Sequence, residues 1–257
     1  MDAIETIKYR GFNINIYQDT DPMNPRTEWD NAGHMVCFHN RYALGDEHHF
    51  TAGNLQVEMA MEACPSIEKT IDYWDNEGYQ RIASKRGHKA AAEKSEAMVA
   101  KIVDKVLGRH YVILPLYFYD HSGITMRTGP FSCPWDSGQV GIIYMTMDEI
   151  EHEWPKAEYP DQKKRAREHM QFEVEEYDCY LTGDVYGYEV EPIDANKAIG
   201  ADDSCWGFYG GKYMQEVIEK EIKPNIDTSI KEYRDRIKAE KAERVKTALF
   251  FRFAWAD

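Results

Sequence analysis

An alternation of apolar and polar residues near the N-terminus predicts a β-hairpin. Between residues 4 and 17, apolar side chains such as Ile14 and Ile16 recur at every second position, and Gly11 separates two such runs. A period of two is the repeat of a strand with one buried face, and the glycine favours a tight turn between the runs. Residues 19–33 then carry Asp-Pro, Asn-Pro and Asp-Asn pairs, which predict a loop before another short strand over residues 34–39.

Helical periodicity dominates the rest of the chain. Apolar residues spaced by three or four predict helices over residues 58–75, 82–107, 147–154, 161–181 and, at the C-terminus, about 212–249. The first of these can equally be two short helices, and Gly108 is the expected C-terminal cap of the second. The C-terminal segment is expected to break near Pro224, because proline cannot donate the helical hydrogen bond.

Apolar runs between the helices predict further strands, over residues 111–119, 139–146, 184–190 and 204–209. The first run contains Pro115, which indicates a sheet edge or a bulge. Strands and helices alternate without the regular spacing of parallel β-α-β units, so we predict an α+β fold, with a mixed or antiparallel sheet packed with several long helices. No linker divides the chain, and we therefore expect a single domain over residues 1–257 that ends in the C-terminal helical segment.

The charge balance narrows the classes of partner. The 257 residues include 45 acidic and 31 basic side chains, and the net charge of −14 disfavours direct binding of nucleic acid. The acidic excess can serve solubility alone or present carboxylates to a basic partner protein. Residues 81–128 are the exception, with nine basic and four acidic side chains. A homodimer could pair this basic helix with an acidic face, and the sequence is compatible with a monomer as well.

Hydropathy and cysteine content favour a cytoplasmic protein. No apolar run approaches the roughly 20 residues of a membrane-spanning helix, and the first 18 residues alternate instead of forming the apolar core of a signal peptide. Five widely spaced cysteines without a CxxC pair fit reduced thiols and match no zinc module. We therefore expect a location in the cytoplasm without membrane association, and the sequence assigns no metal and no cofactor.

Several turns at the ends of the expected elements are rich in Trp, Gly, Asp, Cys and Tyr, and they hold the candidate site residues. If YDHSG (residues 119–123) ends one strand and CPWDSGQ (133–139) enters the next, a hairpin-like return brings His121 and Cys133 to the same rim of the sheet. His121 would then activate the Cys133 thiol and Asp136 would orient the imidazole, giving a nucleophile for acyl or phosphoryl transfer. The residues predicted to bind a ligand are Asp120, Trp135, Gln139, Asp184, Tyr186, Asp203 and Trp206. Such turns also close hydrophobic cores, so a purely structural role stays open.

Several strings resemble a family of uncharacterised proteins carried by bacteriophages and other mobile elements. They are YDHSGITM (residues 119–126), FSCPWDSGQVG (131–141), YLTGDVYGY (180–188) and DSCWGFYG (203–210), with WDN (29–31) and GHMVCFHNRY (33–42) upstream. The similarity spans most of residues 10–210. It implies expression inside a bacterial host cell and an accessory role in takeover of host machinery or evasion of host defence, and it assigns no catalytic residue.

Two functions of different classes follow. The first is a phage-type accessory protein that binds, and inhibits or redirects, a host protein of the defence or nucleic-acid machinery through an acidic surface. The second is an enzyme, or a nucleotide or small-molecule binder, that uses the cluster of Cys133, His121 and Asp136 at the sheet rim. The charge of −14 and the lack of a recognised catalytic signature favour the first.

Overall fold

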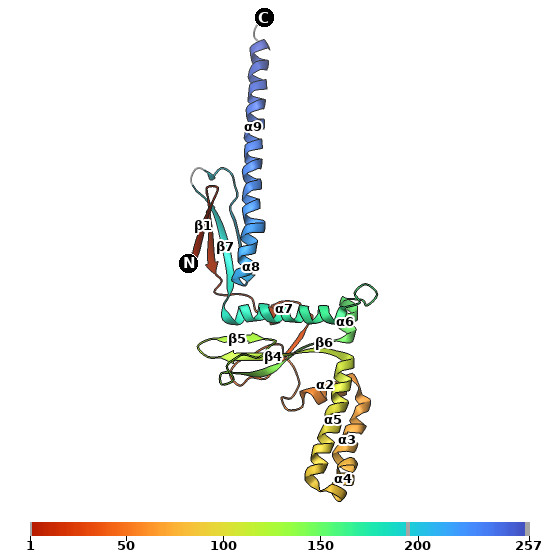
Figure 1. The fold of residues 1–257 in the computed structure, drawn as a ribbon. Coiled ribbons are helices and arrows are strands. Elements are labelled where there is room, and N and C mark those ends of the chain that lie inside the picture. The colour runs from red at the N-terminus through yellow and green to blue at the C-terminus, as the bar shows by residue number, and fades with distance from the viewer. Residues whose placement is uncertain (1, 194–195, 255–257) are drawn as a thin grey trace. The chain divides into compact units, whose positions relative to one another are not determined.

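The computed structural model describes residues 2–193 and 196–254 and has an α+β fold (Figure 1). These residues form two compact units. Unit 1 contains the described residues within Met1–Met23 and Cys179–Asp257, and unit 2 is Asn24–Asp178. Each unit has its own four-stranded antiparallel sheet. The predicted α+β class with antiparallel pairing is therefore confirmed.

The sheet of unit 1 begins with the predicted hairpin. Its strands run in the order β1-β2-β7-β8, and their bounds are β1 Glu5–Tyr9, β2 Phe12–Gln18, β7 Val185–Pro192 and β8 Asp203–Tyr209. The turn between β1 and β2 has two residues, Arg10 at φ 49° and Gly11 at φ 85°. Both lie in the left-handed region, as a type I′ turn requires, which matches the right-handed twist of the strands.

The helices of unit 1 pack on one face of this sheet. They are α8 (Gly211–Val217), the π-helical η4 (Ile218–Ile222) and α9 (Lys223–Ala254). Apolar side chains of β2 such as Phe12 and Ile14 form a buried core with Met214, Ile218 and Ile226 of the helical segment. Figure 1 shows α9 running beside the strands β1 and β7. Successive side chains of a strand point to opposite faces, so the residues between these core positions lie on the other face of the sheet.

The predicted break near Pro224 is wrong. Within the described residues, the C-terminal segment stays helical from Gly211 to Ala254. Pro224 occupies the first turn of α9, where a backbone N–H has no partner within its own α-helix, and the wider π-helical turn η4 directly precedes it. The proline therefore changes the helical winding locally instead of ending the helix.

The sheet of unit 2 has the order β3-β6-β4-β5, with bounds β3 His34–Cys37, β4 Tyr111–Asp120, β5 Ile124–Arg127 and β6 Ser137–Thr146. Pro115 pairs with Ile142 of β6, whereas β5 pairs with β4 only from Tyr117 onward. Pro115 thus has a neighbouring strand on one side, and the register shifts between Leu116 and Tyr117. The proline predicted an edge or a bulge; β4 is an inner strand of the sheet, but Pro115 lies where one side of it is unpaired, next to the register shift.

The helical segments of unit 2 are α1 Pro25–Glu28, α2 Leu55–Ala63, η1 Pro65–Ile67, α3 Glu68–Tyr73, η2 Trp74–Gly78, α4 Tyr79–Arg86, α5 His88–His110, α6 Met147–Glu153 and α7 Gln162–Thr182. The last residues of α7, from Cys179 onward, are assigned to unit 1. The prediction of one helix over residues 82–107 is wrong, because Gly87 separates α4 from α5 with a φ of 83°. The expected cap Gly108 lies inside α5, which continues to His110 and passes directly into β4.

Helices lie along the sheet of unit 2 and bury its apolar side chains. Val36 and Ile142 of the sheet form a core with Met59 of α2, Ile71 of α3 and Val103 of α5. Figure 1 shows α7 running along the sheet of this unit. The helix over residues 161–181 was predicted from an apolar stripe of five residues, of which Ala166, Met170, Val174 and Tyr177 are buried and Leu181 is half-buried.

The expectation of a single domain over residues 1–257 stays a prediction. Among the described residues, no helix combines the length and the apolar composition that a membrane crossing needs.

Candidate functional site

The turns after β4 and before β6 lie at the same end of the unit 2 sheet. The backbone N–H of Asp120 donates to the carbonyl oxygen of Asp136 at 2.9 Å, so the two turns are adjacent. The Cys133 thiol donates to the Asp136 carboxylate, with 3.4 Å between Sγ and Oδ2. The backbone therefore places Cys133 and Asp136 in contact at this rim, beside the residue that precedes His121.

The imidazole of His121 is not positioned as the predicted relay requires. It is exposed, and its Nδ1 lies 3.5 Å from the Ser122 hydroxyl oxygen. Within the part of the chain that the structure describes, it forms no hydrogen bond with Cys133 or Asp136. The carboxylate meets the thiol directly, whereas a Cys-His-Asp relay needs the imidazole between them. Catalysis by these three residues stays a prediction, and this geometry does not support it.

The other predicted ligand residues of unit 2 are held by neighbouring protein groups or extend into solvent. Asp120 forms an ion pair with Arg41. The Gln139 side-chain amide donates to the Gly141 carbonyl oxygen of the same strand at 3.3 Å. Trp135 is 92% exposed, so its indole forms no wall of a closed pocket.

The remaining predicted residues belong to unit 1, and three of them have local structural contacts. Asp184 accepts the backbone N–H of Gly211 at 3.3 Å, at the first residue of α8. A hydrogen bond from Tyr186 to the Asp184 carboxylate raises the pKa of the Tyr186 hydroxyl. Asp203 accepts the hydroxyl of Tyr188 at 2.7 Å. The predicted ligand set is therefore divided between two units.

Trp206, the last predicted residue, lies on the face of the unit 1 sheet that the helices of this unit leave uncovered. Its indole covers Gly187, where an added Cβ would lie 2.1 Å from the ring. The Tyr17 ring is 5.7 Å from the indole, centroid to centroid. A hydrogen bond to Glu189 raises the pKa of Tyr17, and Trp206 is 42% exposed. We refer to Tyr17, Glu189 and Trp206 as the outer-face patch.

A buried ion network in unit 2 was missed from the sequence. The Arg26 guanidinium donates to both carboxylate oxygens of Asp46, at 2.8 and 2.7 Å, and to Glu173 at 2.9 Å. Glu173 also accepts the backbone N–H groups of Ala32 and Gly33, at 2.9 and 3.1 Å. The network therefore fixes the loop before β3 against α7.

The charges in this network shift two pKa values in opposite directions. Burial acts to raise the pKa of Glu173, but the bonds from His169, Gly33 and Arg26 outweigh it and hold this pKa below its ordinary value. The same hydrogen bond to Glu173 raises the pKa of His169. The sequence contained one sign of the network, since Glu173 is three residues after Met170 and so lies on the apolar face of α7.

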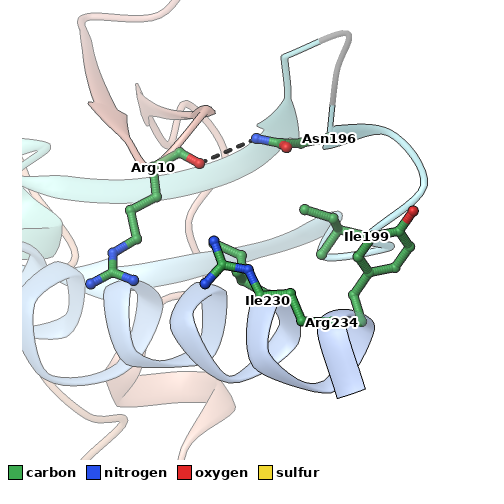
Figure 2. Close-up of a pocket in the computed structure, with 6 residues that line it drawn as sticks. Arg10, Asn196, Ile199, Ile230 and Arg234 are labelled. Atoms are coloured by element: carbon green, nitrogen blue, oxygen red, sulfur yellow. Dashed lines mark hydrogen bonds between the residues drawn. The ribbon is translucent and has the colours of Figure 1, made fainter. Parts of the chain in front are cut away.

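A cavity of about 460 Å³ lies between the β1–β2 turn and α9 in unit 1. Figure 2 shows the guanidinium groups of Arg10 and Arg234 over the same side of α9. The Asn196 amide donates to the Arg10 carbonyl oxygen at 3.2 Å and so holds the turn in place. Arg10 pairs with Asp227 at 2.9 Å, which offsets its charge. The cavity contains none of the residues predicted from the sequence.

Comparisons with protein-family models, curated proteins and solved structures found no match for this chain. Among the described residues, no group of three or more His, Cys, Asp or Glu side chains is arranged to hold a metal ion. The buried Cys37 is an example of an unsuited ligand, because burial raises the pKa of its thiol to about 12. The functional argument therefore depends on surfaces and cavities.

Proposed function

We propose that this chain is a phage-type accessory protein that binds a basic segment of a host protein and so inhibits or redirects that protein. The binding surface is the outer-face patch of unit 1. The observation that carries the proposal is Trp206, held over Gly187 beside Tyr17 on a sheet face that the helices of the unit leave uncovered. The proposed setting, a bacterial cytoplasm, rests on the resemblance of the motif strings to those of phage-carried proteins.

The chemistry of the patch suits a lysine or arginine side chain. The faces of Trp and Tyr rings attract cations, and they add a large apolar contact area. Glu189 supplies a negative charge beside the rings. The same sheet face carries a second carboxylate, Glu191, and one lysine, Lys8, so its charge balance is negative. An anionic or neutral segment would bind this surface less strongly.

The charge of the whole chain supports the same partner class. A net charge of −14 accelerates encounter with a basic protein, and dissolved salt screens that attraction beyond about 8–10 Å. We therefore expect association to slow as ionic strength rises, while the aromatic contacts themselves persist. The alternative function, catalysis at the Cys133 rim, has less support because the thiol donates directly to Asp136.

Affinity capture from bacterial lysate tests the proposal when wild type is compared with matched variants. Trp206→Ala removes the central ring, and Glu189→Gln removes the charge with little change in shape. Trp135→Ala is the control, since it also removes an exposed indole but from unit 2. We expect one protein with a basic segment to be enriched by wild type and by Trp135→Ala, and lost with the two patch variants.

A defined probe completes the test. A fluorescent peptide copied from the basic segment of the captured protein should bind wild type in an anisotropy titration. Trp206→Ala should raise the dissociation constant about tenfold or more, as truncation of a central aromatic residue does at many interfaces. If Trp206→Ala bound the peptide as tightly as wild type, or if only Trp135→Ala lost binding, the outer-face patch would not be the binding surface. Thermal melts confirm that each variant is folded.

A further inference from the structure

A cavity in the helical part of unit 2 combines basic side chains with aromatic rings. It has a volume of about 380 Å³ and lies where α4 packs beside α5 (Figure 1). Its lining includes Tyr73, Trp74, Arg81, Lys85, Arg86 and Lys94. Pockets that hold small molecules typically measure about 300–1,000 Å³, so this volume suits a ligand of nucleotide size. We refer to it as the basic cavity.

The backbone turns sharply at Gly87 to bring the basic side chains together. Gly87 has a φ of 83°, which L-residues rarely adopt, and it both ends α4 and precedes α5. Arg81 and Lys85 are four residues apart and therefore lie on the same side of α4. Lys94, on α5, lines the same cavity. The cations thus come from two helices that converge only because of this turn.

The aromatic side of the basic cavity is built on an unusual helical turn. Residues Trp74–Gly78 form the π-helical η2, a type of turn that is frequent at functional sites. A Cβ at Gly78 would lie 2.8 Å from the Trp74 ring, so the glycine makes room for the indole. The Ser95 hydroxyl donates to the Trp74 carbonyl oxygen, and the Tyr73 ring contacts the indole edge to face at 5.4 Å. The Trp74 backbone is therefore held by Ser95, and the indole by the Tyr73 ring.

The cations of the basic cavity are exposed to solvent, and among the described residues they have no ion-pair partner. Over the described residues, none of Arg81, Lys85, Arg86 and Lys94 forms an ion pair, and no acidic residue belongs to the lining. Other lysines of the chain do have such partners, for example Lys164 with Glu168. Residues 81–94 carry five basic side chains and one acidic, in a chain of net charge −14. A cluster of positive side chains without ion-pair partners suits an anion.

We propose that the basic cavity binds a nucleoside polyphosphate. Several adjacent cations match a ligand with several negative charges, and Arg in particular recognises phosphate through its paired N–H donors. The Trp74 and Tyr73 rings offer a surface on which a base can stack, and such stacking tolerates any base. Inorganic anions would use the cations alone, whereas a nucleotide uses both sides of the cavity. This binding is independent of the outer-face patch, which belongs to unit 1.

Fluorescence anisotropy with a ribose-labelled ATP analogue tests the proposal on the full chain. Unlabelled ATP should displace the probe, and adenosine should displace it only at far higher concentration because it lacks phosphates. The double variant Arg81→Gln/Lys85→Gln should raise the dissociation constant about tenfold or more, since hydrogen bonds to charged groups are among the stronger polar contacts. Trp74→Leu should weaken ATP more than it weakens inorganic tripolyphosphate.

Matched controls separate a specific site from general attraction. Lys238→Gln/Lys241→Gln makes the same charge change on exposed residues of α9 and should leave the dissociation constant within about twofold of wild type. Equal weakening by both double variants would overturn the proposal, as would the absence of saturable ATP binding or equal competition by adenosine. Tight binding of a single-stranded oligonucleotide without any binding of ATP would overturn it too. Thermal melts check that every variant is folded.

Discussion

Replacing Arg26 with methionine tests whether the buried ion network stabilises unit 2. The Arg26 side chain is 1% exposed and pairs with Asp46 at 2.7 Å and with Glu173 at 2.9 Å. Methionine retains much of the aliphatic stem but removes the charge, so two carboxylates lose their shared counterion. Removing one partner of a buried ion pair costs about 3–5 kcal/mol. We expect the free energy of unfolding to fall by about that amount.

Urea titration followed by far-UV circular dichroism measures this loss. Arg165→Met is the matched control, because Arg165 of α7 pairs at 3.6 Å with Asp161, which directly precedes the helix, and both side chains are about half exposed. An exposed pair contributes about 0–1 kcal/mol. If Arg26→Met were no more destabilising than Arg165→Met, the network would be a by-product of packing, and the reasoning from burial would be refuted.

The same titration examines the expectation of a single domain. If both units unfold as one cooperative domain, Arg26→Met should shift a single transition of the whole chain. If the units unfold separately, the variant should shift only part of the signal and leave the remainder at the wild-type midpoint. Two transitions in the wild type would contradict the single-domain expectation while leaving the argument about the ion network intact.

The pH dependence of stability isolates the His169–Glu173 contact within this network. The folded-state pKa of Glu173 is lowered from 4.5, so its contribution is present above that value and is lost as pH falls through the lowered pKa. The folded-state pKa of His169 is raised from 6.5, so its contribution is complete below that value and is lost as pH rises through the raised pKa. His169→Gln should therefore abolish the loss of stability that His169 causes as pH rises. The loss of stability in acid, which comes from Glu173, should remain.

Two further predictions concern the strand β6 and the thiols. Gly141→Ala should destabilise the protein by about 1–3 kcal/mol, because the new Cβ would lie 1.9 Å from the Val36 carbonyl oxygen. Gly138→Ala on the same strand meets open space and should be nearly neutral in urea denaturation; equal effects would contradict the steric argument. Limited alkylation read by mass spectrometry should modify the exposed Cys205 first and Cys37 last, since burial raises the pKa of Cys37 to about 12. Early modification of Cys37 would contradict this order.

Local patterns predicted the secondary structure well where one residue type decides the conformation. The hairpin followed from a period of two and Gly11, and the α7 helix from its apolar stripe. The errors at Gly87 and Pro224 have a common reason. Each residue can either end a helix or be accommodated by a neighbouring turn, and the choice depends on tertiary packing that a short window of sequence does not contain.

The candidate site was only partly accessible from sequence for a different reason. Strand order placed the turns around Asp120 and Asp136 side by side, but which side chain contacts the Cys133 thiol depends on rotamers. The ion network was hidden because Arg26 lies 20 residues from Asp46 and 147 residues from Glu173. No local motif connects positions so far apart, and only the polar residue within an apolar stripe gave a sign of it.

The two proposed binding regions show why net charge describes encounter better than affinity. A charge of −14 repels distant phosphates, yet a bound phosphate interacts mainly with groups within a few ångströms, and all the charged side chains that line the basic cavity are cations. Salt should weaken binding at both regions, because each depends on opposite charges, so a salt titration alone cannot tell them apart. Variants can: Trp206→Ala should weaken the basic partner and leave ATP unaffected, and Arg81→Gln/Lys85→Gln should do the reverse.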